Sequence, residues 1–581
     1  MIEYEIVRSA DRLGHIANEV SNAGVVGLDI ETTALKPHHG EIRLLQLNTG
    51  AGKYVVDLFE TKTMGPLVEA LGGDAIKVIH TAAFEQTWFS AKHDLRLWPL
   101  FDTHRASEIL HSGKNYGHNL YDLYNRELKI APEAPDMGGT DWSGALTKEH
   151  YDYAAEDIMH LPKLRESIKP KLAKAELNKI AAIEFGAVIG EAAFRNAGFR
   201  LDKGRWLELA EKNQKDLKEL SEKLAKMLPH PKGQLGLPGL EPGFNFNSPD
   251  QIKASFARLG IDVDSTDKNV LGMLSGEHEA VKVYLDWKKI RKYLDSFGPD
   301  YLENIDPITG RIHCDYWPFT GAGRYACSKP NLQQIPRGKA FRRCFCPGPG
   351  KVLVICDYGQ IELRIAAEIS GDKILRSIYQ RGEDAHQRTA SLVSGVAYEE
   401  VTKAQRQSAK PVNFGLIYGL GAEKLVIYSK VSYDVDLTLA EAKRFIQRYF
   451  ENYSGVRAWH QRVLRDAERY PIARTLWGRR RFLDPDKARN EFFNTPIQGT
   501  GADGLKRSLP IVWKRLLKYG GRAKMVHMVH DEIVVECDDD PELIAAVKLD
   551  LQEGMIEGIQ DMLPHVPVEA EAGHGESWAD K

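Results

Sequence analysis

The chain has 581 residues, too long for a single hydrophobic core, and its length predicts about two to four domains. The net charge of −3 gives no overall basic character that would indicate a polyanion partner, although local patches set the field at a groove. The six cysteines form no zinc pattern, and no apolar run reaches membrane-spanning length. We therefore expect reduced thiols, a cytoplasmic location and no membrane association.

The first 170 residues alternate between strand-like and helix-like segments. Apolar, β-branched runs at 24–33, 42–49 and 53–59 predict successive strands, and amphipathic stretches near 83–95 and 147–170 predict helices. This alternation predicts an α/β domain.

Two carboxylates share one face of the first of these strands. Asp29 and Glu31 are two residues apart in "VVGLDIETTAL", so both side chains point to the same side while Ile30 points to the other. Two acids on one face repel each other unless a positive group lies between them, which favours a divalent metal. On these residues alone, a solvated strand end is the alternative.

Further polar residues follow in the same region. Glu85 lies on the predicted helix after "VIHTAAF", while Tyr153 and Asp157 are four apart on "YDYAAEDIMHLPKL" and so are neighbours on one helix face. Four acids and a tyrosine would hold two metal ions and orient a water molecule. This equipment suits phosphodiester hydrolysis by a two-metal mechanism.

Residues 20–165 resemble a 3'–5' exonuclease of the DEDD-y class, through "LDIET", "HTAAFE", "DTHRASEIL" and "YAAED" in the family's order. The resemblance implies a ribonuclease H-like α/β fold and a proofreading role. It also implies metal binding by Asp29, Glu31 and Asp157, and orientation of water by Tyr153. The second motif departs from the family, because Thr81 and Glu85 stand where Asn and Asp are usual. We expect Glu85 to be the fourth ligand.

From about 180 to 300 the sequence is mostly helical. Residues 206–228 have apolar positions at helical spacing and a charged opposite face, and 228–244 form a Pro/Gly-rich stretch that predicts a loop. The lysine-rich segment 283–297 predicts a helix that grips phosphates, with a solvated helix face as an equal alternative for any single lysine.

An apolar strand and a basic helix stand out in the C-terminal half. The strand that begins "KVLVICDYGQIELR" at Lys351 ends at Asp357, which is therefore either a rigidly held carboxylate or a turn former. In "AQRQSAKPVNFGLIYG" the residues four apart form a stripe on a helix, cationic first and aromatic second. Such a stripe suits a triphosphate and a stacked base, although a solvated basic face beside buried aromatics is the alternative. The stripe consists of Arg406, Lys410, Phe414 and Tyr418.

The segment "KMVHMVHDEIVVECDDD" places His530, Asp531 and Glu532 between two apolar runs. The runs predict strands, so the three polar residues form either a plain hairpin turn or a metal site. On these residues alone the turn is favoured.

Together these segments resemble the family A DNA polymerases. The motifs "DYGQIELR", "RQSAKPVNFGLIYG" and "VHDE" occur with "TGAGRYACSKPNLQQIP", "DAHQRTA", "TLWGRRRFL" and "NTPIQGTGADGLKR" in the family's order. The resemblance implies an α+β right-hand polymerase domain at 176–581 after an exonuclease domain at 1–175. It implies a thumb at about 200–310, a palm at about 311–370 and 490–581, and fingers at about 371–489.

The resemblance also implies roles for individual residues. Asp357 and Asp531 would bind two Mg²⁺, with Mn²⁺ as a substitute, and Glu532 would support the metals and the primer end. Lys410 would bind phosphate and protonate the departing pyrophosphate. The other residues implied to contact the deoxynucleoside triphosphate are Gln360, Glu362, His386, Arg406, Phe414 and Tyr418. Glu362 would be the steric gate against a 2'-hydroxyl.

Primer-template DNA is the implied partner. Arg324, Asn494 and Gln498 would donate to the minor-groove acceptors that all base pairs share, and His530 would also contact DNA. Gly359 and Asn490 depart from the Ser and Arg of many relatives. We expect a monomer that corresponds to a polymerase large fragment without a 5'-nuclease domain. The residues do not indicate a helicase or primase partner, or whether the source is a bacterium, a phage or an organelle.

Two other functions compete with this interpretation. An exonuclease of the ribonuclease D kind would need no acids at both 357 and 531, and a single-strand binding protein would need no acid clusters at all. The joint presence of Asp357, Asp531, Arg406 and Lys410 argues against both.

Overall fold

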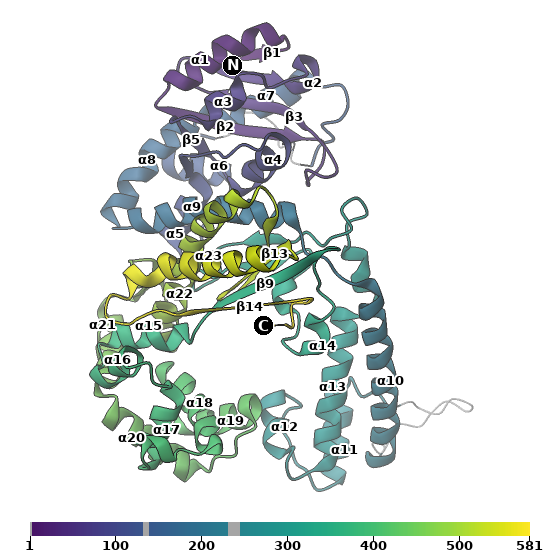
Figure 1. Cartoon of the computed structure of the whole chain (residues 1–581), viewed down its shortest axis with the longest axis vertical. Coiled ribbons are helices and arrows are strands. Elements are labelled where there is room, and N and C mark those ends of the chain that lie inside the picture. The colour runs from purple at the N-terminus through teal and green to yellow at the C-terminus, as the bar shows by residue number, and fades with distance from the viewer. Residues whose placement is uncertain (1–2, 132–136, 138, 230–243, 581) are drawn as a thin grey trace, which may run out of the picture.

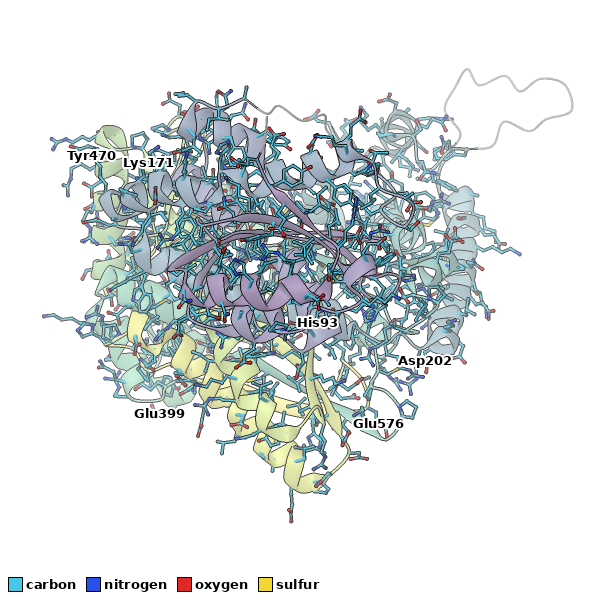
Figure 2. The ribbon with its side chains drawn as sticks, turned by 90° about the horizontal axis from the view of Figure 1, so that it is seen from above. His93, Lys171, Asp202, Glu399, Tyr470 and Glu576 are labelled. Carbon is cyan, nitrogen blue, oxygen red and sulfur yellow. The ribbon has the colours of Figure 1, made fainter. Side chains whose placement is uncertain are left out.

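The computed structural model describes residues 3–131, 137, 139–229 and 244–580. An N-terminal α/β unit lies above a central sheet, and two helical arms descend on either side of that sheet (Figure 1). Seen from above, the N-terminal sheet lies over the middle of the molecule, with Tyr470 and Asp202 at opposite margins (Figure 2). All six cysteines are buried free thiols, as predicted. Among the described residues, no helix has both the length and the apolar character to cross a membrane.

The N-terminal unit contains a six-stranded sheet in the order β1-β4-β3-β2-β5-β6. β3 runs antiparallel to β2 and β4, whereas β1, β5 and β6 pair in parallel with their neighbours. The predicted α/β pattern is therefore confirmed. The strands are β1 (Glu5–Val7), β2 (Val25–Thr32), β3 (Ile42–Asn48), β4 (Lys53–Asp57), β5 (Ile76–Ile79) and β6 (Leu100–Asp102). The helices are α1 (Leu13–Asn22), α2 (Leu58–Thr61), α3 (Leu67–Gly72), α4 (Ala83–His93), α5 (Thr103–His111), α6 (Leu120–Leu123), α7 (Lys148–Met159) and α8 (Leu161–Lys174).

Helix α9 (Asn178–Ala197) joins the N-terminal unit to the rest of the chain and carries a buried charge, Glu184. Glu184 pairs with Arg105 of α5 at 3.3 Å, with Lys506 of α22 (Glu491–Leu516) at 2.6 Å and with Arg479. Buried charges are costly unless they are paired, so separating these residues would leave uncompensated buried charges. The network therefore links α5 of the N-terminal unit to α22 of the C-terminal half.

One helical arm has a small apolar core of its own, which includes Phe256, Tyr284 and Trp287. The helix predicted at 206–228 is confirmed by α10, which begins three residues earlier and ends one residue earlier. The predicted loop at 228–244 lies mostly outside the described residues. The arm consists of α10 (Lys203–Met227), α11 (Pro249–Arg258), α12 (Lys268–Leu274) and α13 (Glu279–Phe297).

The central sheet is antiparallel, in the order β12-β13-β9-β14. Its strands are β9 (Lys351–Tyr358), β12 (Ala523–Val529), β13 (Glu532–Asp538) and β14 (Ala570–Gly575), and α22 (Glu491–Leu516) and α23 (Pro541–Ile559) pack beside it (Figure 1). The predicted hairpin is confirmed, because only His530 and Asp531 separate β12 from β13. His530 has a φ of 55°, in the left-handed region that a tight turn uses. Short strands β7 (Asp315–Trp317), β8 (Ala326–Ser328), β10 (Ile472–Arg474) and β11 (Arg480–Phe482) form two small hairpins, and α14 (Lys339–Arg342) precedes β9.

The second arm is entirely helical. Helix α18 (Lys403–Ile417) carries the predicted basic and aromatic stripe, and Tyr418 caps its C-terminus. Pro411 lies inside this helix and is buried, so the helix continues through a residue that lacks an N–H donor. The arm and its connection to β9 consist of α15 (Ile361–Ser370), α16 (Lys373–Gln380), α17 (Ala385–Ser394), α18 (Lys403–Ile417), α19 (Ala422–Tyr433), α20 (Leu439–Asn452) and α21 (Ser454–Arg469).

Candidate active sites

Three carboxylates converge in the N-terminal unit. Asp29 and Glu31 project from β2, and Asp157 projects from α7, which packs across that strand. One oxygen from each lies within 4.8 Å of the other two. The two-residue spacing on β2 puts the first two acids on one face, and the helix supplies the third.

Glu85 lies beside this group rather than within it. It sits in the first turn of α4, is 3% exposed, and shares a side-chain hydrogen bond with Asp29. Its Oε2 atom is buried with no hydrogen-bond partner in the described structure. The start of α4 is fixed by Asp102, which accepts hydrogen bonds from the backbone N–H groups of Thr81 (3.3 Å) and Ala82 (2.9 Å).

Burial makes these carboxyl groups hard to ionise. It raises the pKa of Asp29 to about 7, and burial with the charge of Asp29 raises the pKa of Glu31 to about 10. Burial followed by the Asp29 charge also raises the pKa of Asp157. A divalent cation would relieve both the desolvation and the repulsion, so the donor set and the unpartnered Glu85 oxygen fit such an ion.

Tyrosines surround the third carboxylate. Tyr153 hydrogen-bonds to Asp157 from the same helix, as its four-residue spacing predicts. Tyr121 also donates to Asp157 Oδ1 at 3.0 Å, and Tyr124 donates to the Asp157 carbonyl at 2.8 Å. No local sequence pattern predicts the contacts of Tyr121 and Tyr124 with Asp157, because these tyrosines come from a segment that reaches Asp157 only in the folded protein.

A second site lies where the central sheet meets the all-helical arm. A cavity of about 700 Å³ opens there. Ten of the residues singled out in the sequence line it: Arg324, Asp357, Gln360, Glu362, Phe414, Tyr418, Gln498, His530, Asp531 and Glu532. It is also lined by Arg337, Arg342, Tyr428 and Tyr433, which no sequence pattern singled out.

The hairpin and the neighbouring strand bring Asp357 and Asp531 to the same wall of the cavity. Asp357 lies near the end of β9, opposite Glu532 of β13, and the Tyr358 N–H donates to the Asp531 carbonyl at 3.3 Å. Burial and then the nearby Asp357 charge raise the pKa of Asp531 to about 6. A buried carboxylate that resists ionisation beside a second acidic side chain fits a divalent cation. Burial lowers the pKa of His530 to about 4, which keeps its ring neutral.

Two side chains fix the orientation of the Glu532 carboxylate. The Trp578 indole donates to one of its oxygens at 2.6 Å, and Arg342 lies 3.5 Å from the other. The Arg342 guanidinium also lies 4.1 Å from the centre of a Trp578 ring. Glu532 thus enters the cavity with its orientation already set.

Glu362, which lines the cavity, contacts both Arg324 and the residue that caps the end of α18. It forms an ion pair with Arg324 at 2.6 Å and accepts a hydrogen bond from the Tyr418 hydroxyl. Three side chains from three parts of the chain therefore hold one another in place next to Asp357.

Four predicted residues do not line the cavity: His386, Arg406, Lys410 and Asn494. Arg406 pairs with Asp384, the N-cap of α17, at 2.6 Å, and Lys410 follows it one turn later on the half-exposed side of α18. Asn494 lies one helical turn before Gln498 on α22. The aromatic ring of His386 lies 5.7 Å from that of Phe414, and burial lowers the pKa of His386 to about 4.

Family comparisons divide the chain in the same two parts. The model of DNA polymerase family A matches residues 208–580, and a 3'-5' exonuclease model matches residues 4–173. DNA polymerase I of Aquifex aeolicus (strain VF5) is 31% identical over 605 residues, covering 99% of this chain and 100% of that protein. The thermostable DNA polymerase I of Thermus aquaticus is 36% identical over 359 residues, which span 58% of this chain and 42% of the Thermus protein.

A solved structure has the same fold. The POL domain of Pol1 from M. smegmatis, in complex with DNA primer-template and dNTP, superposes with a TM-score of 0.83 at 23% identity and covers 99% of both chains. The family model extends over more than half of this chain, and the Aquifex relative matches it from end to end. The chain therefore belongs to DNA polymerase family A and carries a 3'-5' exonuclease domain ahead of its polymerase region.

Proposed function

We propose that this DNA polymerase extends a primer at the site of Asp357 and Asp531 and removes mismatched 3' nucleotides at the site of Asp29, Glu31 and Asp157. The observation that carries the proposal is the convergence of two separate carboxylate groups, one beside a cavity with a basic and aromatic helix. The M. smegmatis relative holds primer-template and dNTP, which supports the same ligands here. We assign the exonuclease domain to 1–175 and the polymerase domain to 176–581. The thumb is at about 200–310, the palm at about 311–370 and 490–581, and the fingers at about 371–489.

Asp357 and Asp531 would hold Mg²⁺, two ions in all, with Mn²⁺ as a substitute. When bound, these ions acidify the primer 3'-hydroxyl and neutralise charge on the triphosphate. Glu532 fixes the position of the primer end beside them, and Trp578 and Arg342 prevent it from turning away.

The fingers helix binds the incoming nucleotide. Arg406 and Lys410 attract its phosphates, and Lys410 gives a proton to the pyrophosphate oxygen that leaves. His386 donates a further hydrogen bond to the phosphates, and Phe414 packs on the nucleotide. Arg406 is already oriented by Asp384, so little of its side-chain freedom is lost on binding.

Glu362 and Gln360 face the sugar. The Glu362 carboxylate is fixed by Arg324 and Tyr418, and a fixed group excludes a 2'-hydroxyl better than a mobile one. Arg324, Asn494, Gln498 and His530 donate to atoms that all base pairs share in the minor groove. The enzyme therefore accepts every correct pair without reading its sequence.

At the exonuclease site, Asp29, Glu31, Asp157 and Glu85 would hold a pair of Mg²⁺ or Mn²⁺ ions, which when bound activate water for attack on the phosphodiester. Tyr153 orients that water, and Tyr121 holds Asp157 in position. We further propose that the protein is a cytoplasmic monomer.

A primer-extension assay with Mg²⁺ and four deoxynucleoside triphosphates tests this function. We expect products that lengthen stepwise and stop when the nucleotide complementary to the next template base is omitted. An exonuclease of the ribonuclease D kind would shorten the primer under all of these conditions and would overturn the proposal.

A further inference from the structure

His386 is linked to a buried series of hydrogen bonds that ends at Tyr453. Its Nδ1 atom lies 3.0 Å from Asn413 Nδ2, and Asn413 Oδ1 accepts from the Thr389 hydroxyl at 2.9 Å. The Thr389 hydroxyl lies 2.8 Å from that of Tyr453, between α20 and α21. None of the four residues is more than 5% exposed.

Tyr453, at the end of this series, sets the direction in which the hydrogen bonds are donated. In the described structure, the Tyr453 hydroxyl has one hydrogen-bond partner, Thr389. A buried hydroxyl proton needs an acceptor, so Tyr453 donates to Thr389. Thr389 then has its single proton left for Asn413 Oδ1, and this turns the Asn413 amide nitrogen toward His386.

The direction of these hydrogen bonds determines which nitrogen of the His386 imidazole carries the proton. Asn413 donates to Nδ1, so Nδ1 must be unprotonated, and the proton of the neutral ring is on Nε2. The opposite tautomer would place two N–H donors against each other at 3.0 Å. His386 therefore presents an N–H group at Nε2, which can donate a hydrogen bond to a phosphate oxygen.

We propose that Tyr453, Thr389 and Asn413 are positioning residues that hold His386 in its Nε2–H tautomer, so that the ring donates to the triphosphate of the incoming nucleotide. The inference rests on the phosphate contact proposed above for His386. It assigns a nucleotide-binding role to a tyrosine that does not touch the nucleotide.

The charges around His386 allow a test by pH. Asp384 faces it from the start of α17, and Arg406 and Lys410 face it from α18. Glu383 and Arg388 nearby pair with each other at 2.8 Å, and Tyr453 is the group that approaches from α20. The ring is neutral at neutral pH, so the tautomer rather than the charge supplies the donor in the unmodified protein.

Asn413→Asp would reverse the tautomer. A carboxylate at 413 accepts from Nδ1–H, which leaves Nε2 without a proton while the ring is neutral. At low pH the carboxylate favours the doubly protonated ring, and the Nε2 donor returns. In single-turnover incorporation we expect the Kd for the incoming nucleotide to rise about tenfold between roughly pH 6 and pH 9 in this variant. This is the change expected from the loss of one hydrogen bond to a charged group. The unmodified protein should show no such rise.

Two further variants separate positioning from folding. Tyr453→Phe keeps the ring but removes the hydroxyl proton that sets the direction of the hydrogen bonds. We expect it to raise the nucleotide Kd about threefold, because part of the energy of one hydrogen bond is lost, with little change in the maximum rate. In a His386→Gln background, whose amide donates in any state of Asn413, Tyr453→Phe and Asn413→Asp should change neither the Kd nor its pH dependence.

The outcomes are distinct. If Asn413→Asp shows the same flat pH profile as the unmodified protein, or if Tyr453→Phe has equal effects in the unmodified protein and in the His386→Gln background, the positioning role is wrong. If His386→Ala leaves the Kd unchanged, the phosphate contact itself is wrong. A pH-dependent Kd in Asn413→Asp that disappears in the double variant supports the proposal.

Discussion

The indole of Trp578 donates a hydrogen bond of 2.6 Å to the carboxylate of Glu532, 46 residues earlier in the chain. The contact ties the C-terminal segment to the hairpin formed by β12 and β13. Both residues are buried, so water does not replace the bond if it is lost.

Trp578→Phe should therefore slow primer extension. It keeps most of the packing but leaves one Glu532 oxygen without its donor, and we expect the maximum rate to fall about tenfold, as for other groups that orient a metal-site carboxylate. Trp98→Phe, on the exonuclease domain and 39% exposed, is the matched control. Equal rates for both variants in rapid-quench assays would remove Trp578 from the account.

Glu362→Ala should admit ribonucleotides. The change opens the space beside the sugar and frees Arg324 and Tyr418, so discrimination between deoxynucleotide and ribonucleotide should fall by roughly tenfold to a hundredfold. Glu362→Gln keeps the bulk and weakens only the ion pair, and it should discriminate almost normally. Competition assays on a single template position measure both, and unchanged selectivity in the alanine variant would contradict the assignment.

Phe414→Tyr should make the polymerase less selective against dideoxynucleotides. Phe414 lines the cavity beside the proposed sugar position, and a tyrosine hydroxyl there would take over a hydrogen bond that the missing 3'-hydroxyl normally makes. We expect the ratio of deoxynucleotide to dideoxynucleotide incorporation to fall by at least about tenfold. Phe450→Tyr, on α20, serves as the control for an added hydroxyl.

Metal binding at the exonuclease site should release protons. Asp29 has a pKa of about 7 in the folded protein against its usual 3.8, so the folded state binds more protons than the unfolded state between these values. The contribution of Asp29 to stability is therefore largest at low pH and falls as the pH rises toward 7, and Glu31 extends this loss to about pH 10. We expect the metal-free protein to have a lower Tm at about pH 8 than at about pH 6, and Mg²⁺ to restore it.

Calorimetry in buffers of different ionisation enthalpy counts the protons released. Asp29→Ala combined with Glu31→Ala should abolish both the proton release from this site and the effect of Mg²⁺ on its stability. A metal-independent Tm in the unmodified protein at both pH values would show that this carboxylate group does not bind the ion.

We expect the unmodified protein to have exonuclease activity although it carries Glu85 where related exonucleases usually have Asp. Asp29→Ala with Glu31→Ala should eliminate degradation of a mismatched primer and leave extension unaffected, because the two sites lie in separate domains. Glu85→Ala should reduce degradation by about a hundredfold, the cost of misplacing groups at a reacting centre. If the unmodified protein degrades no single-stranded DNA with Mg²⁺ or Mn²⁺, the site is inactive, and Glu85→Asp becomes the change expected to restore it.

The sequence predicts those parts of the sites that depend on local periodicity. Asp29 and Glu31 share a face because side chains alternate on a strand, and Tyr153 meets Asp157 because they are one helical turn apart. The hairpin at Asp531 follows from two apolar runs separated by polar residues. These features need only a few neighbouring residues.

What the sequence does not predict depends on long-range packing. Trp578 reaches Glu532, Tyr121 reaches Asp157, and Glu184 joins Arg105 to Lys506 only after distant elements have assembled. No spacing rule links such pairs, since their separation in sequence is arbitrary. The position of Glu85 beside the converging carboxylates likewise depends on how α4 packs against β2.

Asp357→Asn tests the central claim most directly, namely that two independent sites on one chain carry out synthesis and degradation. The variant keeps the shape of the side chain and removes its charge. With a paired primer, Mg²⁺ and all four deoxynucleoside triphosphates, we expect no detectable extension, while a mismatched primer is degraded at the rate of the unmodified protein. Extension at a near-normal rate, or loss of degradation together with extension, would contradict the account.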